Sequence, residues 1–355
     1  MSVGNIFLDG TLVDVDVSFW SGAKILQPED LGLKEEEVAE AFHLGRKLLI
    51  PAEIIREFRA IEARARRLVE INSFSFPIGN ARFVPRKKFP KVLGQLKEFQ
   101  EKYLVLVDSL ITNYNTYRDQ MLPMYEKAAE SAWMRKNPDT KEFGIDYNPE
   151  ADKAQFVQEF KARIASFYPE AESLRRKFAL DWNVYEIAIP RLRQSTGDAV
   201  VEQVVGEERA RVAEEEYRVQ MRTKVDGFVN EVVTSLRTQT AELASRILAN
   251  IKEGKVVKTQ TLESLTNYIE QFKELNFVGD QTVEDQLDSL KRDVLDKYTS
   301  EDLKEGEAVE VMKRKLGEIV EATSNVNDLS NITGQYKRKI SWRDDEASDN
   351  SGSGQ

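Results

Sequence analysis

The chain contains no cysteine and a single histidine, His43, among its 355 residues. Without cysteine it forms neither disulfides nor thiolate metal sites, and one histidine cannot build a histidine metal centre within one subunit. It has no run of about 18 apolar residues, and its N-terminus lacks a basic region followed by an apolar one. We therefore expect a cytoplasmic protein that neither spans a membrane nor holds a metal or cofactor.

The balance of charge is acidic, with 61 aspartates and glutamates against 51 lysines and arginines. The resulting net charge of −10 argues against a protein that coats nucleic acid or anionic membrane with its whole surface. Apolar residues make up 41% of the chain, enough for a folded core, and the 32% of charged residues is typical of long solvated helices.

The longest regular stretch covers residues 207–254, where apolar residues recur every three or four positions and no proline intervenes. Such a helix would be about 70 Å long and would need a second long helix to bury its apolar face. Residues 90–135 carry a second stripe of this kind. The two stripes predict an elongated, mostly α-helical protein built on a long antiparallel coiled-coil hairpin.

Two stretches indicate a small β element near the N-terminus. Residues 11–20 alternate between apolar and polar, which predicts a half-buried strand. Residues 73–85 predict a hairpin that turns at Gly79 and Asn80. Because proline cannot donate a ladder hydrogen bond, Pro77 and Pro85 favour a hairpin at a sheet edge or in an exposed arm.

The order of these patterns suggests four regions. They are a small β/α base at 1–50, a long helical hairpin region at 51–254 that includes a basic arm at 73–91, a C-terminal helical bundle at 255–325, and a disordered tail at 326–355. We also expect helices at about 148–167, 169–181, 260–275, 281–298 and 306–323, and a strand within 182–190 beside the N-terminal strands.

Residues 51–102 are basic, with twelve lysines and arginines against six glutamates. Phenylalanines are interleaved with the charges around the hairpin, and cations on phosphates with aromatic rings under bases hold single-stranded nucleic acid. The candidate contacts for nucleic acid or a partner protein are Arg82, Arg86, Lys87, Lys88, Lys91, Phe76 and Phe83. The favoured alternative is that the phenylalanines pack the hairpin onto helices while the charges are solvated or meet an acidic partner.

No catalytic constellation emerges. The stretch Asp9–Asp14 resembles the first motif of haloacid-dehalogenase-type phosphatases, but Phe7 stands where that family has its nucleophilic aspartate. His43 has no serine or carboxylate partner placed by the sequence. Phosphate-binding glycine loops are absent as well. We therefore predict no catalytic, cofactor or metal site.

The segment Leu12–Gly32 resembles the N-terminal signature of the DUF3150 family of uncharacterised proteins, which shares a hydrophobic strand, Trp-Ser-Gly-Arg-Lys and Pro-Glu-Asp-Leu-Gly. The matching residues here include Trp20, Gly22, Pro28, Asp30 and Gly32, whereas Ala23 replaces the expected arginine. Read physically, Trp20 is a buried aromatic beside a tight turn that fixes a small sheet against helices. A peptide-docking face is the alternative.

The resemblance implies an origin in phages or mobile elements, often with a MoxR/CobS-like AAA+ ATPase and a von Willebrand factor A-type protein encoded nearby. It thus suggests an adaptor or structural partner of such a machine. From the two long stripes and the lack of a catalytic constellation, we expect a non-enzymatic protein that contacts the AAA+ ATPase or copies of itself. We expect a homo-oligomer or a subunit of a larger complex. The alternative is a nucleic-acid-associated factor that binds through 51–102.

Overall fold

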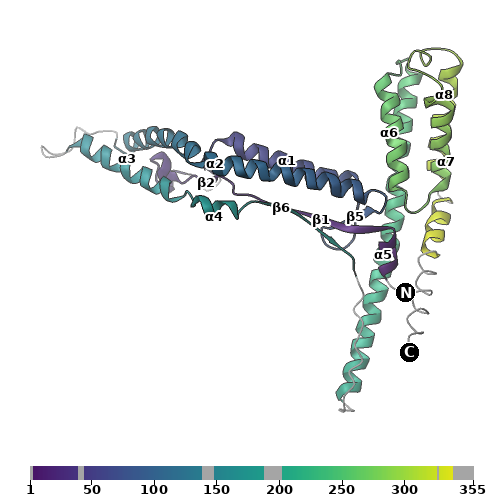
Figure 1. Ribbon diagram of the computed structural model, residues 1–355, viewed down its shortest axis with the longest axis horizontal. Coiled ribbons are helices and arrows are strands. Elements are labelled where there is room, and N and C mark those ends of the chain that lie inside the picture. The colour runs from purple at the N-terminus through teal and green to yellow at the C-terminus, as the bar shows by residue number, and fades with distance from the viewer. Residues whose placement is uncertain (1–2, 39–43, 138–147, 188–201, 326–327, 339–355) are drawn as a thin grey trace. The chain divides into compact units, whose positions relative to one another are not determined.

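The computed structural model describes residues 3–38, 44–137, 148–187, 202–325 and 328–338 (Figure 1). The chain divides into two compact units, each assembled from separate segments. Unit 1 comprises Met1–Asp14, Val69–Leu93 and Asn183–Gln355, and unit 2 comprises Val15–Leu68 and Gly94–Trp182. This division differs from the contiguous regions expected from the sequence, because helices and strands pass from one unit into the other.

The structure is mostly helical, as predicted. Its α-helices are α1 (Ala52–Ile71), α2 (Phe89–Lys136), α3 (Pro149–Ser166), α4 (Ala171–Arg175), α5 (Glu202–Lys252), α6 (Thr259–Leu275), α7 (Gln281–Leu290) and α8 (Glu307–Thr323). Shorter helical turns are η1 (Val3–Leu8), η2 (Pro28–Leu31), η3 (Glu35–Glu37) and the π-helical turn η5 (Lys291–Leu295). The two longest predicted helices, 90–135 and 207–254, correspond to α2 and α5.

A four-stranded sheet has the order β4-β5-β1-β6, formed by β1 (Gly10–Ser18), β4 (Phe74–Ser75), β5 (Arg82–Pro85) and β6 (Ala179–Tyr185). The predicted strand at 11–20 and hairpin at 73–85 are both present. The hairpin lies at one edge of the sheet, as predicted, with β4 outermost, while β5 lies between β4 and β1 and pairs antiparallel with both. Proline is tolerated because Pro85 is the last residue of β5.

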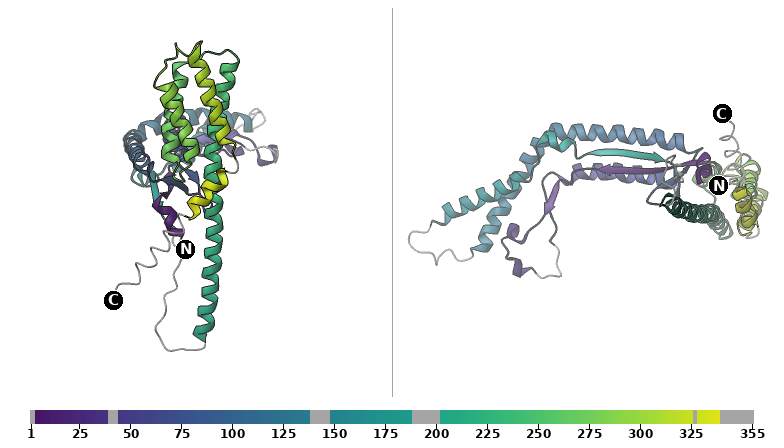
Figure 2. Two further views of the ribbon diagram at one scale, coloured as in Figure 1. Left: turned by 90° about the vertical axis from the view of Figure 1, so that its right-hand side faces the viewer. Right: turned by 90° about the horizontal axis from the view of Figure 1, so that it is seen from below.

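The apolar stripe of α5 is buried within unit 1, where α5 packs against α8 and α6 turns back along it (Figure 2). Residues of this shared core include Val229, Val232, Ile269, Leu287 and Leu316. The prediction that the 90–135 helix is the partner of α5 is therefore wrong. An amphipathic stripe shows that a helix face is buried, but it does not identify the helix that covers it.

Two further predictions need correction. The helix expected at 169–181 is limited to α4, and the chain continues as β6 from Ala179, next to β1. Within the expected disordered tail, residues 328–338 are helical and bury Ile332 and Tyr336. The Tyr336 hydroxyl donates to Asp9 Oδ2 at 2.7 Å, which fixes this helix to the start of the chain. Residues 339–355 lie outside the described residues.

The core of unit 2 centres on α1 and α2. The ring of Phe58 lies 5.2 Å from that of Tyr103 and 4.9 Å from that of Phe178, measured between centroids. A two-stranded ribbon, β2 (Ala23–Ile25) with β3 (Arg46–Leu48), belongs to the same unit. The strand β2 lies within Leu12–Gly32, the segment that resembles the family signature.

Candidate functional site

The signature segment 28–32 forms one wall of a cleft in unit 2. Pro28 opens η2, where its fixed φ suits a first helical position, and Gly32 ends it in the left-handed conformation with φ 71°. A Cβ atom at Gly32 would lie 2.3 Å from the carbonyl oxygen of Ala132 in α2. Only glycine therefore allows this turn to lie so close to the α2 backbone.

Asp30 anchors this wall from inside. Its side chain is 3% exposed, and its carboxylate lies 2.5 Å from Lys47 Nζ of β3 and 2.8 Å from an Arg163 nitrogen of α3. The same carboxylate accepts the Gln27 backbone N–H at 2.9 Å. A buried carboxylate needs such pairing because desolvation otherwise disfavours its charge. Asp30 thus ties three separate parts of unit 2 to one point.

Trp20 and Gly22 also hold the fold together. This agrees with the prediction that Trp20 is a buried aromatic residue beside a tight turn. Trp20 is 9% exposed and packs edge-on against Tyr114, with ring centroids 6.0 Å apart. Gly22 has φ 60°, and a Cβ atom there would lie 2.8 Å from the Ile50 side chain. The signature residues shape and stabilise unit 2.

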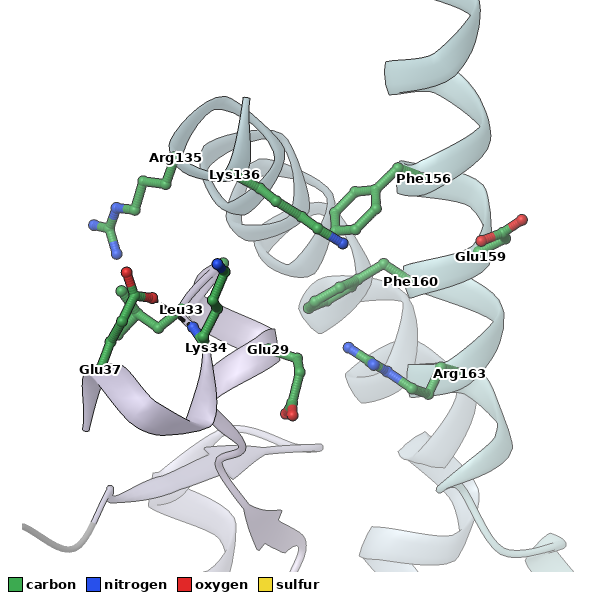
Figure 3. A pocket seen from close by; sticks show the side chains of 11 residues that line it. Glu29, Leu33, Lys34, Glu37, Arg135, Lys136, Phe156, Glu159, Phe160 and Arg163 are labelled. Carbon is green, nitrogen blue, oxygen red and sulfur yellow. Dashed lines mark hydrogen bonds between the residues drawn. The ribbon is translucent and has the colours of Figure 1, made fainter. Parts of the chain in front are cut away.

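The cleft beside this wall has a volume of about 670 Å³ (Figure 3). It is lined by Glu29, Gly32, Leu33, Lys34, Glu37, Arg135, Lys136, Phe156, Glu159, Phe160 and Arg163. The rings of Phe156 and Phe160 are 6.4 Å apart, and the Arg163 guanidinium lies 5.0 Å from the Phe160 ring. Figure 3 shows Lys136 extending toward Phe156 and Arg163 lying below Phe160. The cleft thus offers aromatic surface next to charges of both signs.

Tyr125 supports the cleft from behind and donates its hydroxyl hydrogen to the carbonyl of Leu48. Burial raises the pKa of Tyr125 to about 12, and the negative charge of Asp30 adds to the shift. Because the phenol stays protonated at neutral pH, it acts as a hydrogen-bond donor that holds β3 in place.

The basic hairpin does not present its aromatic residues to a ligand. Phe76 is 4% exposed and Phe83 is fully buried, so neither is available to stack on a base. The ring of Phe83 lies 5.0 Å from that of Phe277, and Phe76 lies 5.1 Å from Phe228. The aromatic contacts predicted for nucleic acid are therefore wrong, and the phenylalanines pack the core of unit 1.

The cations of the hairpin are used in several ways. Arg82 Nε donates to Ser73 Oγ at 2.7 Å, and Lys88 is buried in an ion pair with Glu274. Arg86 and Lys87 are exposed and also donate to the backbone carbonyls of Leu8 and Lys273. Lys91 is exposed. Contacts of these exposed cations with phosphates or an acidic partner stay a prediction.

Within the described part of the chain, no group of three or more acidic or histidine side chains is placed to hold a metal ion. Of the helices described, none is long and apolar enough to cross a membrane.

The two residues weighed as catalytic candidates gain no support from the structure. His43 lies outside the described residues. Asp9 lies in the turn before β1 and accepts the hydroxyl of Tyr336.

The fold thus defines a mostly helical protein with a small antiparallel sheet, in which the signature segment shapes the cleft of unit 2. The chain belongs to the DUF3150 family, described as proteins of unknown function, whose family model matches residues 9–314. This match confirms the resemblance seen in Leu12–Gly32. No curated protein and no solved structure matches the chain significantly.

The sequence singled out Pro28, Asp30 and Gly32 as a structural signature, but it predicted neither the cleft nor the residues on its other side. Lys47 and Arg163, which pair with Asp30, are 17 and 133 residues away from it in the chain. A buried aspartate predicts that partners exist, but spacing alone does not identify them. The Phe156 and Phe160 pair, four residues apart on α3, was the available signal for an aromatic helix face.

Proposed function

We propose that the chain is a non-enzymatic adaptor that binds a segment of another protein in the cleft of unit 2. The observation that supports this proposal most strongly is the composition of the cleft, in which two phenylalanines lie among four cations and three carboxylates. Apolar surface with a charged rim is the usual composition of a protein-binding surface. A partner segment with one apolar side chain and flanking charges would place the apolar side chain on the phenylalanines and its charges against the charged rim.

The rigidity of the cleft wall supports the same function. Gly32 lies against α2, and Asp30 joins η2 to β3 and α3, so the wall is held before any partner arrives. A preformed site loses less conformational entropy on binding than a mobile one. The volume of about 670 Å³ is also within the range of about 300–1,000 Å³ that is common for ligand sites.

The family resemblance suggests a MoxR/CobS-type AAA+ ATPase as the partner to test first. Size-exclusion chromatography with light scattering would be run on the chain alone, on a MoxR/CobS-type AAA+ ATPase from the same genome, and on their mixture. We expect a mixed complex that is weakened at least about tenfold by the double variant Arg135→Glu and Lys136→Glu, because both exposed cations line the cleft.

Lys127→Glu is the matched control, since Lys127 is an exposed lysine of α2 that does not line the cleft. It should leave the complex unchanged. The absence of any complex with the ATPase, or equal weakening by the control, would contradict the proposed role of the cleft with this partner.

A further inference from the structure

The first turns of α5 differ from the rest of the helix. From Met221 to Ile251, a side chain is buried at every third or fourth position. Before Met221, three large apolar residues are exposed: Val212 by 50%, Tyr217 by 37% and Val219 by 55%. Figure 2 shows this end of α5 extending past α6, α7 and α8. Among the residues described, no helix of unit 1 covers this end.

Val212 and Val219 lie on one face of the helix. Seven residues make about two turns, so the two side chains are about 20° apart around the axis. Met221, which is buried, lies about 160° from Val219, on the face that packs within unit 1. The exposed valines therefore form a separate apolar line that points away from the bundle.

Two opposite charges lie beside this apolar line, both on the same side of it, one before Val219 and one after it along the helix. Glu215 comes four residues before Val219 and Arg222 comes three residues after it, and both are exposed. Residues at these spacings are neighbours on a helix surface. Glu215 also pairs with Arg218 of its own chain at 3.8 Å, but the side chains are 65% and 40% exposed and ion pairs open to solvent in this way are weak.

We propose that two copies of the chain associate through this face, with α5 packed antiparallel against α5 of the second copy near Val219. In this arrangement each residue faces one that is equally far on the other side of the centre, and Glu215 and Arg222 are equally far from a centre midway between Arg218 and Val219. Glu215 therefore meets Arg222 of the second copy, and Arg222 meets its Glu215. The contact is self-complementary and closes as a two-fold dimer.

The charge pattern selects this direction over the parallel one. In a parallel two-fold pair, Glu215 and Arg222 of one copy would lie on the opposite flank of the contact from those of the other copy, so neither would meet its opposite charge. The antiparallel pair instead gives two ion pairs on either side of the Val219 contact. The surface belongs to unit 1, so this inference stands independently of the cleft in unit 2.

The test is sedimentation equilibrium of the full chain over a range of concentrations. The wild type should be a dimer that dissociates on dilution. Glu215→Arg and Arg222→Glu should each raise the dissociation constant about tenfold, since each turns two attractive pairs into repulsive ones. Val219→Asp should abolish the dimer, because it would place two unpaired carboxylates at the centre.

Combining the two charge reversals distinguishes a specific contact from a general loss of structure, because it should restore the dimer. An equimolar mixture of Glu215→Arg and Arg222→Glu chains should form a heterodimer of wild-type strength, because the reversed charges complement each other across the contact. The chain carrying both substitutions should also dimerise like the wild type. Val256→Asp is the control for Val219→Asp, since Val256 is 54% exposed and lies outside α5.

A wild-type chain that stays monomeric at all concentrations would overturn the proposal. A dimer that survives Val219→Asp, or a charge-reversed pair that fails to associate on mixing, would overturn it equally.

Discussion

The two units fill their cores with different aromatic chemistry. The core of unit 1 contains a cluster of phenylalanine rings that come from η1, the β4–β5 hairpin, α5 and the loop after α6. They are Phe7, Phe74, Phe76, Phe83, Phe228 and Phe277. Unit 2 uses tyrosines whose hydroxyls donate to backbone carbonyls. Tyr103 donates to Ser18 at 2.6 Å, Tyr114 to Pro169 at 2.8 Å and Tyr168 to Leu49 at 2.6 Å, and Tyr125 donates to Leu48.

This difference follows from the backbone around each core. In unit 1 the rings lie between helices and strands whose peptide groups bond to each other, so apolar rings suffice. In unit 2 the core is closed by loops and by a ribbon of three-residue strands. Carbonyls there need other donors because buried backbone groups are rarely left unpaired. The tyrosines supply these donors.

Both units also bury a charged cluster. In unit 1, Arg237 of α5 bonds to Asp280 at 2.6 Å and to Asp328 at 2.5 Å, and it also donates to the carbonyl of Asn325 at 2.9 Å. In unit 2, Asp30 has the corresponding role with Lys47 and Arg163. Each cluster joins segments that are far apart in the sequence.

The largest effect is expected from Asp30→Ala, which leaves Lys47 buried without a counter-charge. Breaking a buried pair in this way costs about 3–5 kcal/mol of unfolding free energy. Three of the four tryptophans, Trp20, Trp133 and Trp182, belong to unit 2, and Trp342 lies outside the described residues, so tryptophan fluorescence during urea unfolding reports mainly on unit 2.

Asp108→Ala serves as the control, because the pair of Asp108 with Arg175 is exposed on both sides and should contribute less than about 1 kcal/mol. Equal losses for Asp30→Ala and Asp108→Ala would show that Asp30 does not anchor unit 2.

A second effect is expected from alkaline pH. Burial raises the pKa of Tyr114 and of Tyr125 to about 12, and it also raises the pKa of Tyr103 and Tyr168, from an ordinary value of about 10. Below pH 10 the tyrosines are protonated in both the folded and the unfolded chain, so their full contribution to the free energy of unfolding is present. Between pH 10 and 12 the unfolded chain loses protons that the folded unit retains, so stability falls.

The urea midpoint seen by tryptophan fluorescence should therefore drop steeply from pH 10 to 12. In unit 1, burial raises the pKa of Tyr268 as well, but the phenylalanine cluster does not titrate. Circular dichroism, which sees both units, should record a second transition that is less sensitive to pH. A pH-independent fluorescence midpoint would refute the role given to the tyrosines.

The smallest effect is expected from Tyr103→Phe, which removes the hydroxyl that donates to Ser18 while keeping the ring that packs on Phe58. Loss of one such hydrogen bond costs about 1–2 kcal/mol when the acceptor is left unpaired. Tyr117→Phe is the control on the same helix, since the Tyr117 hydroxyl forms no hydrogen bond to any of the described residues. If both variants unfold at the same urea concentration, the Tyr103 hydroxyl contributes nothing.

The sequence was sufficient for most helices because a periodic apolar face is a local signal. The expected helices at 90–135, 260–275 and 306–323 match α2, α6 and α8 within one residue at each end. The partners of these helices were not predictable in the same way. The stripe of α5 was assigned to a single long helix, whereas α8, α6 and α7 share its core.

The candidate site shows the same limit. Pro28, Asp30 and Gly32 were singled out by a family resemblance, and the structure gives each of them a physical role. The opposite side of the cleft comes from α3 and the end of α2, more than 100 residues further along. No local pattern links these segments, because the link is the pairing of Asp30 with Arg163 in three dimensions.

The interleaving of the two units has a consequence for synthesis on the ribosome. Unit 2 has all its residues once Trp182 has been made, whereas unit 1 needs segments from both ends of the chain. Phe74, Phe76 and Phe83 are therefore translated long before Phe228 and Phe277, the rings that cover them. During that interval the covering rings have not yet been made, so we expect unit 2 to fold first and the aromatic core of unit 1 to close only late in synthesis.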